Sequence, residues 1–136
     1  INQDTLGLAL SQYSKAELKV FQNQYQEALQ LLDSILVQYP KNSLEDDVFY
    51  LQAKIYNHLQ LRDSAISRYN LILKDHKEEI RADNALYEMA QIYDYQLNDK
   101  EKAKSLYERL FTEFSGSTLA VEARQRFRKL RGDTVQ

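Results

Sequence analysis

The sequence contains no cysteine and no tryptophan, and only three glycines and one proline among its 136 residues. Without cysteine the chain can form neither a disulfide nor a cysteine-ligated zinc site. A β-sandwich or barrel needs a turn about every ten residues, and this chain has too few turn-forming residues for that. It also has no run of eighteen apolar residues, so no segment of it is expected to span a membrane. These absences favour long helices joined by short polar connections.

Neither sign of charge dominates, because 18 basic residues face 20 acidic ones and the formal net charge is −2. This balance excludes a general electrostatic attraction to nucleic acid, and we expect no nucleic-acid partner. Basic residues do concentrate at the end, where residues 99–136 hold nine basic and six acidic side chains. Two explanations stay open: a solvated last helix whose cations complement its dipole, or a contact for an anion or an acidic peptide.

An internal repeat returns every 37 or 38 residues. Three similar runs begin at Ala28, Ala65 and Ala103, and each places apolar side chains at i, i+4, i+7 and i+8, which is a helical stripe. A second series, Ala53–Tyr56 and Ala90–Tyr93, is 37 residues apart. Each repeat is therefore predicted to be a pair of helices that cross closely at a small alanine. Such pairs must stack, because one pair alone cannot bury both apolar faces.

Local signals set the expected ends of these helices. Ser43 and Asp46 have the spacing of a capping box. Asn98 resembles a turn residue followed by the N-cap Asp99, and Gly132 lies where a C-terminal glycine cap belongs. The predicted helices cover residues 4–22, 25–39, 43–58, 62–75, 80–96, 99–114 and 117–131.

The repeated residues resemble the tetratricopeptide repeat family. Its pattern is a small residue, an aromatic three positions later and an alanine nine positions after that, and Ala53, Tyr56 and Ala65 match it. The next repeat, Ala90–Ala103, matches with one extra residue in the turn. The resemblance implies an all-α, right-handed α-solenoid of three helix pairs and a C-terminal capping helix. The expected layout is a single domain, 1–136, with repeats near 5–40, 43–77 and 80–115 and a capping helix at 117–131.

The sequence also departs from the family pattern. Lys19 replaces the aromatic residue of the first repeat, and the usual turn glycine is replaced by Asn23, Gln60 and Asn98. The segment 117–124 is similar to inter-repeat segments of bacterial envelope members, such as outer-membrane assembly lipoproteins and a Tol-associated division coordinator. This narrower likeness favours the bacterial periplasm or an outer-membrane-attached location over the cytoplasm. Because the chain starts at Ile1, we expect it to be a piece of a longer protein.

A ladder of tyrosines is the strongest functional pattern. Tyr13, Tyr50 and Tyr87 are 37 residues apart, and the next step falls on Arg124. In the family that the chain resembles, the first helix of each pair lines a concave groove that holds ligands. Tyrosine suits such a face, since it combines a large rigid ring with a polar tip. The alternative is that the rings only fill space between helices. The predicted groove residues are Tyr13, Tyr50, Lys54, Asn57, His58, Tyr87, Gln91, Asp94, Tyr95, Arg124 and Arg128.

No motif points to catalysis, a metal or a cofactor. The two histidines, His58 and His76, are eighteen residues apart and form no close metal-binding pair, and the scattered glycines form no phosphate loop. We therefore expect a non-catalytic module that binds a peptide or a partner helix in the groove. The alternative is a structural or oligomerisation segment of a longer scaffold. Leu6, Leu8 and Leu10 favour that alternative, since they surround a first helix with no preceding helix to cover it, and they suggest self-association through it.

Overall fold

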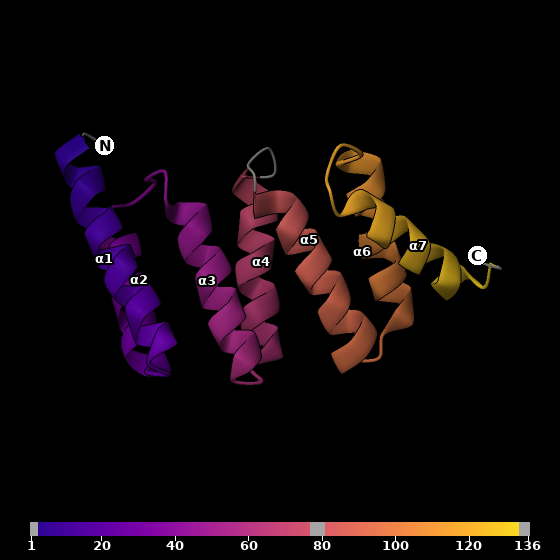
Figure 1. The fold of residues 1–136 in the computed structure, drawn as a ribbon, viewed down its shortest axis with the longest axis horizontal. Coiled ribbons are helices and arrows are strands. Elements are labelled where there is room, and N and C mark those ends of the chain that lie inside the picture. Colours follow the sequence, from indigo (N-terminus) through magenta and orange to yellow (C-terminus); the bar gives the residue numbers. More distant parts are fainter. Residues whose placement is uncertain (1–2, 77–80, 134–136) are drawn as a thin grey trace. The chain divides into compact units, whose positions relative to one another are not determined.

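The computed structural model describes residues 3–76 and 81–133, and within those residues the chain is helical and has no strand (Figure 1). The predicted helices are all present and differ from the expected ranges by a few residues at their ends. Residues 77–80, which include the expected end of the second repeat and the expected start of the helix at residue 80, lie outside the described part. The helices are α1 (Gln3–Phe21), α2 (Tyr25–Gln38), α3 (Glu45–His58), α4 (Arg62–His76), α5 (Arg81–Gln91), the π-helical turn η1 (Ile92–Gln96), α6 (Lys100–Glu113) and α7 (Ala120–Arg131).

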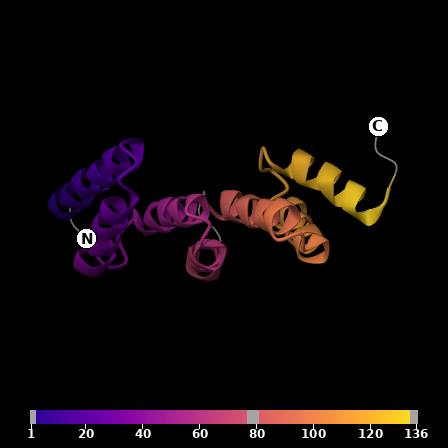
Figure 2. The ribbon, with the colours of Figure 1, turned by 90° about the horizontal axis from the view of Figure 1, so that it is seen from below.

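The chain divides into two compact units, Ile1–Leu71 and Ile72–Gln136, and the division falls within α4. In the first unit, α1 and α2 lie side by side as a helical hairpin (Figures 1 and 2). The small residues Ala16 and Ala28 are completely buried, as the family pattern requires. Gln12 Nε2 adds a bond between the helices by donating to the Leu31 carbonyl at 3.0 Å. The core of this unit is formed by Ala9, Ala16, Ala28, Leu29, Leu32, Ile35, Val48 and Ile55.

Helix α3 packs on α2 through both apolar and polar contacts. Ala53 and Ala65, the small residues predicted at the crossing of α3 and α4, are both completely buried. Gln52 is also completely buried, and its Nε2 donates to Asp33 Oδ1 on α2 at 2.8 Å. The first unit thus joins successive repeats by a neutral donor on α3 and a carboxylate on the preceding helix.

Non-glycine residues in the left-handed conformation make the tight turns within the first unit. Asn23 and Gln60 have φ values of 61° and 64°, at two of the positions where the family pattern has glycine. Each turn is closed by a bond from residue i to i−3 and one from i+1 to i−4, which satisfies the last helical carbonyls: Asn23 and Gln24 in one turn, Gln60 and Leu61 in the other. Asn23 and Gln60 therefore adopt a left-handed backbone conformation that glycine would adopt without steric cost.

The predicted capping box at Ser43 is wrong. Helix α3 starts at Glu45, its N-cap residue is Leu44, and no side chain caps it there. Asn42 instead accepts a bond from the Leu44 amide at 2.6 Å, while the Lys41 amide donates to Glu45 Oε2 at 3.1 Å. The connection is stabilised one residue earlier than the sequence spacing suggests, because Asn forms such local turns readily.

In the second unit, the extra residue of the third repeat does not lie in the turn as predicted. The helix end Ile92–Gln96 widens into the π-helical turn η1, in which Leu97 N bonds to Ile92 O at 2.9 Å and Asp99 N to Tyr93 O at 2.7 Å. A single inserted residue is the usual origin of such a turn. Asn98 still has a left-handed φ of 54°, and Asp99 caps α6 by accepting from the Lys102 amide, as predicted.

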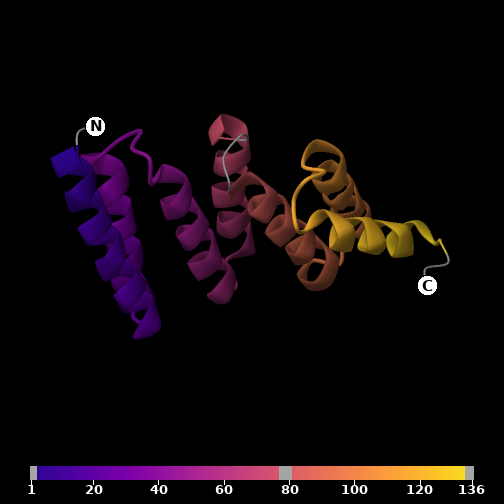
Figure 3. The ribbon, with the colours of Figure 1, turned by 45° about the horizontal axis from the view of Figure 1, so that its top comes forward.

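Helices α6 and α7 pack against each other, as Figures 2 and 3 show. The Phe111 and Phe127 rings meet edge to face with their centroids 5.3 Å apart, and Ala123 is completely buried. Gly132 ends α7 with a φ of 96°, which confirms the predicted glycine cap. In the described ranges, 3–76 and 81–133, none of the helices is both long and apolar enough to cross a membrane.

Candidate functional site

In the first unit, the ladder residue Tyr50 is half-buried. Its ring packs edge-on against the completely enclosed Tyr69, with centroids 5.9 Å apart and planes at 65°. Lys54, one turn later on α3, places its Nζ 5.5 Å from the centre of the Tyr50 ring. Tyr50 is therefore a partly exposed ring with a fixed aromatic support behind it and a cation beside it.

The other predicted groove residues of this unit have different surroundings. Tyr13 on α1 is half-buried and packs against the core. His58 is exposed in the last turn of α3, and its ring lies 4.7 Å from that of Tyr25. Asn57 is half-buried. Of the predicted set in this unit, Tyr50 and Lys54 form an aromatic–cation pair.

In the second unit, Tyr87 repeats the arrangement of Tyr50. Its half-buried ring packs edge-on against Tyr107, with centroids 6.2 Å apart and planes at 66°. The Tyr87 hydroxyl donates to Glu122 Oε2 on α7 at 3.0 Å. Burial, and then the neighbouring Glu122 carboxylate, raise the pKa of Tyr87 to about 12. The polar tip of this tyrosine is thus used inside the protein, and its ring face is what remains for a ligand.

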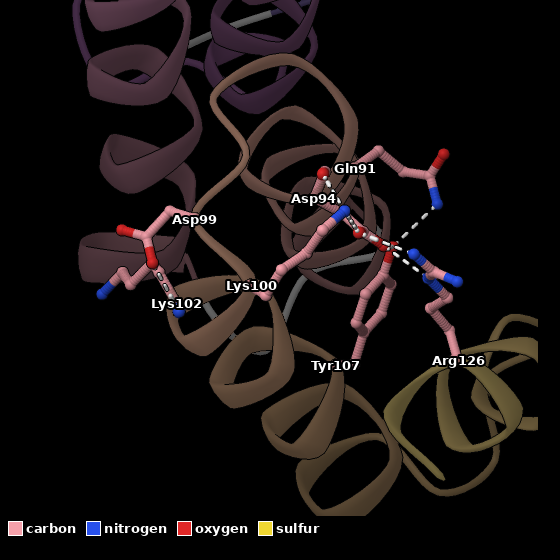
Figure 4. Close-up of polar contacts among 7 residues, drawn as sticks. All are labelled: Gln91, Asp94, Asp99, Lys100, Lys102, Tyr107 and Arg126. Atoms are coloured by element: carbon pink, nitrogen blue, oxygen red, sulfur yellow. Dashed lines mark hydrogen bonds and ion pairs between the residues drawn. The ribbon is translucent and has the colours of Figure 1, made fainter. Parts of the chain in front are cut away.

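Asp94 contradicts the groove prediction, because its side chain is completely buried. Arg126 donates to it through Nε at 2.6 Å and through a terminal nitrogen at 2.9 Å. Lys100 Nζ donates at 2.8 Å and the Tyr107 hydroxyl at 3.0 Å (Figure 4). Burial alone would raise the pKa of Asp94, but these donors, Arg126 foremost, lower it to about 2. Asp94 is therefore an internal anchor and not a ligand contact.

Two further predicted groove residues surround this anchor. Gln91 Nε2 donates to the Tyr107 hydroxyl at 3.0 Å, so its side chain is also used internally (Figure 4). Tyr95 is 60% exposed. The Arg126 guanidinium lies 5.0 Å and the Lys100 Nζ 5.5 Å from the centre of the Tyr95 ring. Tyr95 thus covers the two cations of the anchor and presents its other side outward.

The predicted residues on α7, Arg124 and Arg128, are exposed. The Arg124 guanidinium lies 5.2 Å from the centre of the Phe111 ring. Both arginines line a pocket of about 340 Å³ beside α7, together with Ser115, Ala120, Val121 and Gln125. This is a concave surface on which two positive charges lie beside apolar side chains.

Sequence reasoning missed the residues that hold Asp94. Arg126 was counted only as one of several basic residues near the end of the chain, and Lys100 and Tyr107 were not singled out. One signal was available: Arg126 lies 37 residues after Met89, and Met89 lies 37 after Gln52. Residues at this step point inward, since Gln52 and Met89 are buried, so an arginine there requires a buried acid.

Within the described residues, no group of three or more histidine or acidic side chains lies close enough together to hold a metal ion. The first unit instead shows a supported aromatic ring with a cation beside it, and the second shows aromatic pairs, ion pairs and a pocket lined by two arginines. Such a surface can recognise another chain through ring faces and guanidinium groups.

Three comparisons with known proteins bear on this surface. The sequence profile of the tetratricopeptide repeat matches residues 6–42 and 84–117. The first of these repeats is the one in which Lys19 replaces the usual aromatic residue. No curated protein matches the chain. A solved tetratricopeptide repeat protein from Parabacteroides merdae aligns over 91% of this chain at 23% identity, with a TM-score of 0.71. This chain covers 46% of that protein, so it spans about half its length.

Proposed function

Because the chain belongs to the tetratricopeptide repeat family, we propose that it binds a protein or peptide partner and performs no catalysis. Repeats of this family generally mediate contacts between proteins. The observation that carries the proposal is the recurrence of one arrangement: Tyr50 and Tyr87 are 37 residues apart, and each is half-buried against a completely buried tyrosine.

This arrangement suits an interface anchor. A ring that is held edge-on by a second ring has little rotational freedom left to lose when a partner covers it. Anchors of this kind are often worth about 2 kcal/mol or more in binding. Tyr69 and Tyr107, which stand behind the two rings, fix them without being reachable themselves.

We propose that the contact residues are the predicted groove residues without Asp94, with each unit contributing its own part. The hydroxyl of Tyr87 and the amide of Gln91 already have internal partners, so these two would contribute mainly their apolar surface. The proposed contact residues are Tyr13, Tyr50, Lys54, Asn57, His58, Tyr87, Gln91, Tyr95, Arg124 and Arg128.

Site-specific photo-crosslinking tests this proposal in the intact protein in its own cells. A benzophenone amino acid would replace Tyr50 or Tyr87, one at a time, and Val37 would serve as the control position. Val37 is 80% exposed on α2, outside the proposed contact residues. We expect a defined adduct from positions 50 and 87 and none from position 37.

Affinity measurements on the partner identified in this way complete the test. Tyr50→Ala and Tyr87→Ala should each weaken binding by about 30-fold, the equivalent of about 2 kcal/mol. Their circular dichroism should remain that of a helical protein. Equal crosslinking at position 37, or parent-like binding by both alanine variants, would contradict the proposal.

A second candidate function, self-association, rests on the apolar surface of α1. Leu10, Leu18 and Phe21 are 45%, 53% and 85% exposed, and their spacing places them on one side of the helix. Leu8 is also exposed, at 60%, and adds to the apolar surface of this helix. Sedimentation equilibrium would test this role: the parent should dimerise and Phe21→Glu should be monomeric, whereas a monomeric parent at high concentration would exclude it.

A further inference from the structure

The charge of α7 is distributed unevenly over its faces. The helix carries five basic residues and one acidic residue, Glu122. Two of the basic residues have a carboxylate partner on the same chain: Arg126 binds the buried Asp94, and on the surface Arg131 Nε donates to Asp133 at 3.1 Å. Glu122 accepts from the Tyr87 hydroxyl. The positive charge that remains on α7 is therefore concentrated away from the surface that packs on α5 and α6.

Arg124 and Arg128 carry much of this remaining charge. They are four residues apart on α7, so their positions along the helix axis differ by about 6 Å. Among the side chains that the structure describes, in residues 3–74 and 81–133, neither arginine has an ion-pair partner within 4 Å, although Arg128 is near enough to help lower the pKa of the Asp133 carboxyl. The Arg124 guanidinium is held 5.2 Å from the Phe111 ring, which limits its rotation without neutralising its charge.

Apolar surface lies beside these two arginines, one helical turn before Arg124. The pocket of about 340 Å³ that they line also includes Ala120, Val121 and Gln125 of α7 and Ser115 of the preceding connection. Val121 is 66% exposed. The α7 residues 121, 124, 125 and 128 follow one another at i, i+3, i+4 and i+7, so they form one continuous stripe along the helix. We call this stripe with its pocket the α7 arginine face.

We propose that the α7 arginine face binds an acidic peptide segment of the partner, with two carboxylates about 6 Å apart on Arg124 and Arg128 and one apolar side chain beside Val121. The proposal rests on the proposed function, since it specifies the chemistry of the partner that the chain would bind. Carboxylates four residues apart on a helix have the required separation. Arginine pairs with each of them through a planar fork of donors, which gives both affinity and orientation.

A peptide fits this face better than a nucleic acid does. Binding of single strands uses exposed aromatic rings on which bases stack. The pocket lining contains no aromatic side chain, and the nearby Phe111 ring is covered by Arg124. An apolar wall of Ala120 and Val121 has no counterpart in a phosphate backbone, whereas it matches an apolar side chain beside acids.

The anchors behind α7 prepare this face for binding. Arg126 with Asp94, and Glu122 with Tyr87, hold α7 from its packing side through two separate polar contacts. A face on a helix that is held in this way does not have to be ordered when the partner arrives, which lowers the entropic cost of association.

Fluorescence anisotropy of a labelled synthetic peptide tests the proposal with the full chain. The probe is a helical peptide of about 14 residues with two glutamates at i and i+4 and a leucine one turn outside the pair, at i−3 or i+7. The comparison probe has glutamine in place of both glutamates. We expect the acidic probe to bind and the glutamine probe to bind about tenfold or more weakly, with the acidic probe losing affinity as salt rises.

Two double variants with the same loss of charge localise the binding. Arg124→Gln with Arg128→Gln should weaken binding of the acidic probe about tenfold or more. The control, Lys102→Gln with Lys129→Gln, removes two exposed charges of the same unit and should change binding by about twofold or less. All four side chains are exposed, so both proteins should unfold nearly as the parent does.

Three outcomes overturn the inference: equal binding of the two probes, equal loss in the two double variants, or selective binding of a single-stranded oligonucleotide at Arg124 and Arg128 in place of the acidic probe. The proposed function is tested separately by crosslinking at Tyr50 and Tyr87. A partner that crosslinks there but does not depend on the arginines would leave the proposed function intact and remove only this inference. Probe binding that depends on the arginines, without any crosslink at Tyr50 or Tyr87, would keep this inference and remove the proposed function of the two tyrosines.

Discussion

The segment that ends the first helix of a repeat is one residue longer in the second unit, where α5 continues into η1, than in the first unit, where α3 ends at His58. The side chain at the same repeat position has a different role in the two units. Ala53 and Ala65 are separated by 12 positions, whereas Ala90 and Ala103 are separated by 13. The first unit closes this segment with an ordinary helix end and a left-handed residue, and the second widens it into a π-helical turn. The same position of the repeat, 37 residues on, holds the half-buried Asn57 in one unit and the completely buried Asp94 in the other.

The comparison teaches that a repeat protein can convert a surface position into an internal anchor with two changes. The inserted residue accompanies the inward position of Asp94, and Arg126 supplies the charge that a buried carboxylate needs. At the position of Arg126, the preceding repeats have Met89 and Gln52. Without Arg126, the buried carboxylate of Asp94 would lose the partner that gives it two of its hydrogen bonds, so the two changes support each other.

Removal of the anchor carboxylate should have the largest effect. Asp94→Ala leaves Arg126, Lys100 and the Tyr107 hydroxyl without their shared acceptor. A fully buried broken pair costs about 3–5 kcal/mol, and we expect about 2–3 kcal/mol here because both cations can reach water. Urea unfolding would measure the loss.

The matched change in the other unit is Asn57→Ala. The Asn57 Oδ1 is buried and has no hydrogen-bond partner among the described residues. Its removal should therefore change the free energy of unfolding by about 1 kcal/mol or less. Equal losses in the two variants would show that the two positions are equivalent after all.

Acid should weaken the second unit through the same carboxylate. The pKa of Asp94 is about 2 in the folded chain against 3.8 for an ordinary aspartate. Since the folded pKa is the lower one, the stabilisation is complete above pH 4 and is lost as the pH falls towards 2. We expect this to remove about 2 kcal/mol, observed as a drop in the urea midpoint over that range.

Asp94→Asn provides the control for the acid experiment. The variant cannot take up a proton at this position, so its stability should change less between pH 4 and 2 than that of the parent. If the urea midpoints of the parent and the variant fall equally between pH 4 and 2, the acid sensitivity arises from another group in the protein.

The parts of the fold that follow from local pattern could be predicted from the sequence. The buried alanines at the crossings, the glycine cap at Gly132 and the N-cap Asp99 all depend on residues close in sequence. The role of Asp94 could not be predicted in the same way. It depends on Arg126, 32 residues away, and on whether an insertion is absorbed in the turn or in the helix, which the packing decides.

The candidate site shows the same limit. Half-burial of Tyr50 and Tyr87 agrees with equal spacing in a helical repeat, because equal spacing gives equal orientation. The internal partners of Tyr87 and Gln91 are on other helices, so periodicity along one helix could not reveal them. Side chains that look equivalent along the sequence therefore differ in whether their polar ends are free for a partner.

The smallest effect is expected at the turns. Gln60 has a φ of 64°, a conformation in which a side chain costs about 1–2 kcal/mol and glycine costs little. Gln60→Gly should raise the free energy of unfolding by about 0.5–1 kcal/mol, after allowance for the freedom that glycine gains in the unfolded chain.

Asn98→Gly is the matched change in the second unit, where φ is 54°. Asparagine adopts this conformation more easily than glutamine, so the gain should be near zero. Thermal unfolding would measure both variants. A larger gain in stability from Asn98→Gly than from Gln60→Gly would contradict the assignment of backbone strain to the turn at Gln60.

The central claim is that Asp94 and Arg126 form one coupled anchor that holds α7 in place. A double-mutant cycle with Asp94→Asn and Arg126→Met tests it most directly. The first change gives the third repeat the residue that the second has at position 57, and the second gives α7 the residue that α5 has at the same step, Met89. We predict a coupling of about 1.5 kcal/mol or more in the free energy of unfolding, with the double variant more stable than the sum of the single losses implies. Additivity of the two losses within about 0.5 kcal/mol would contradict the claim.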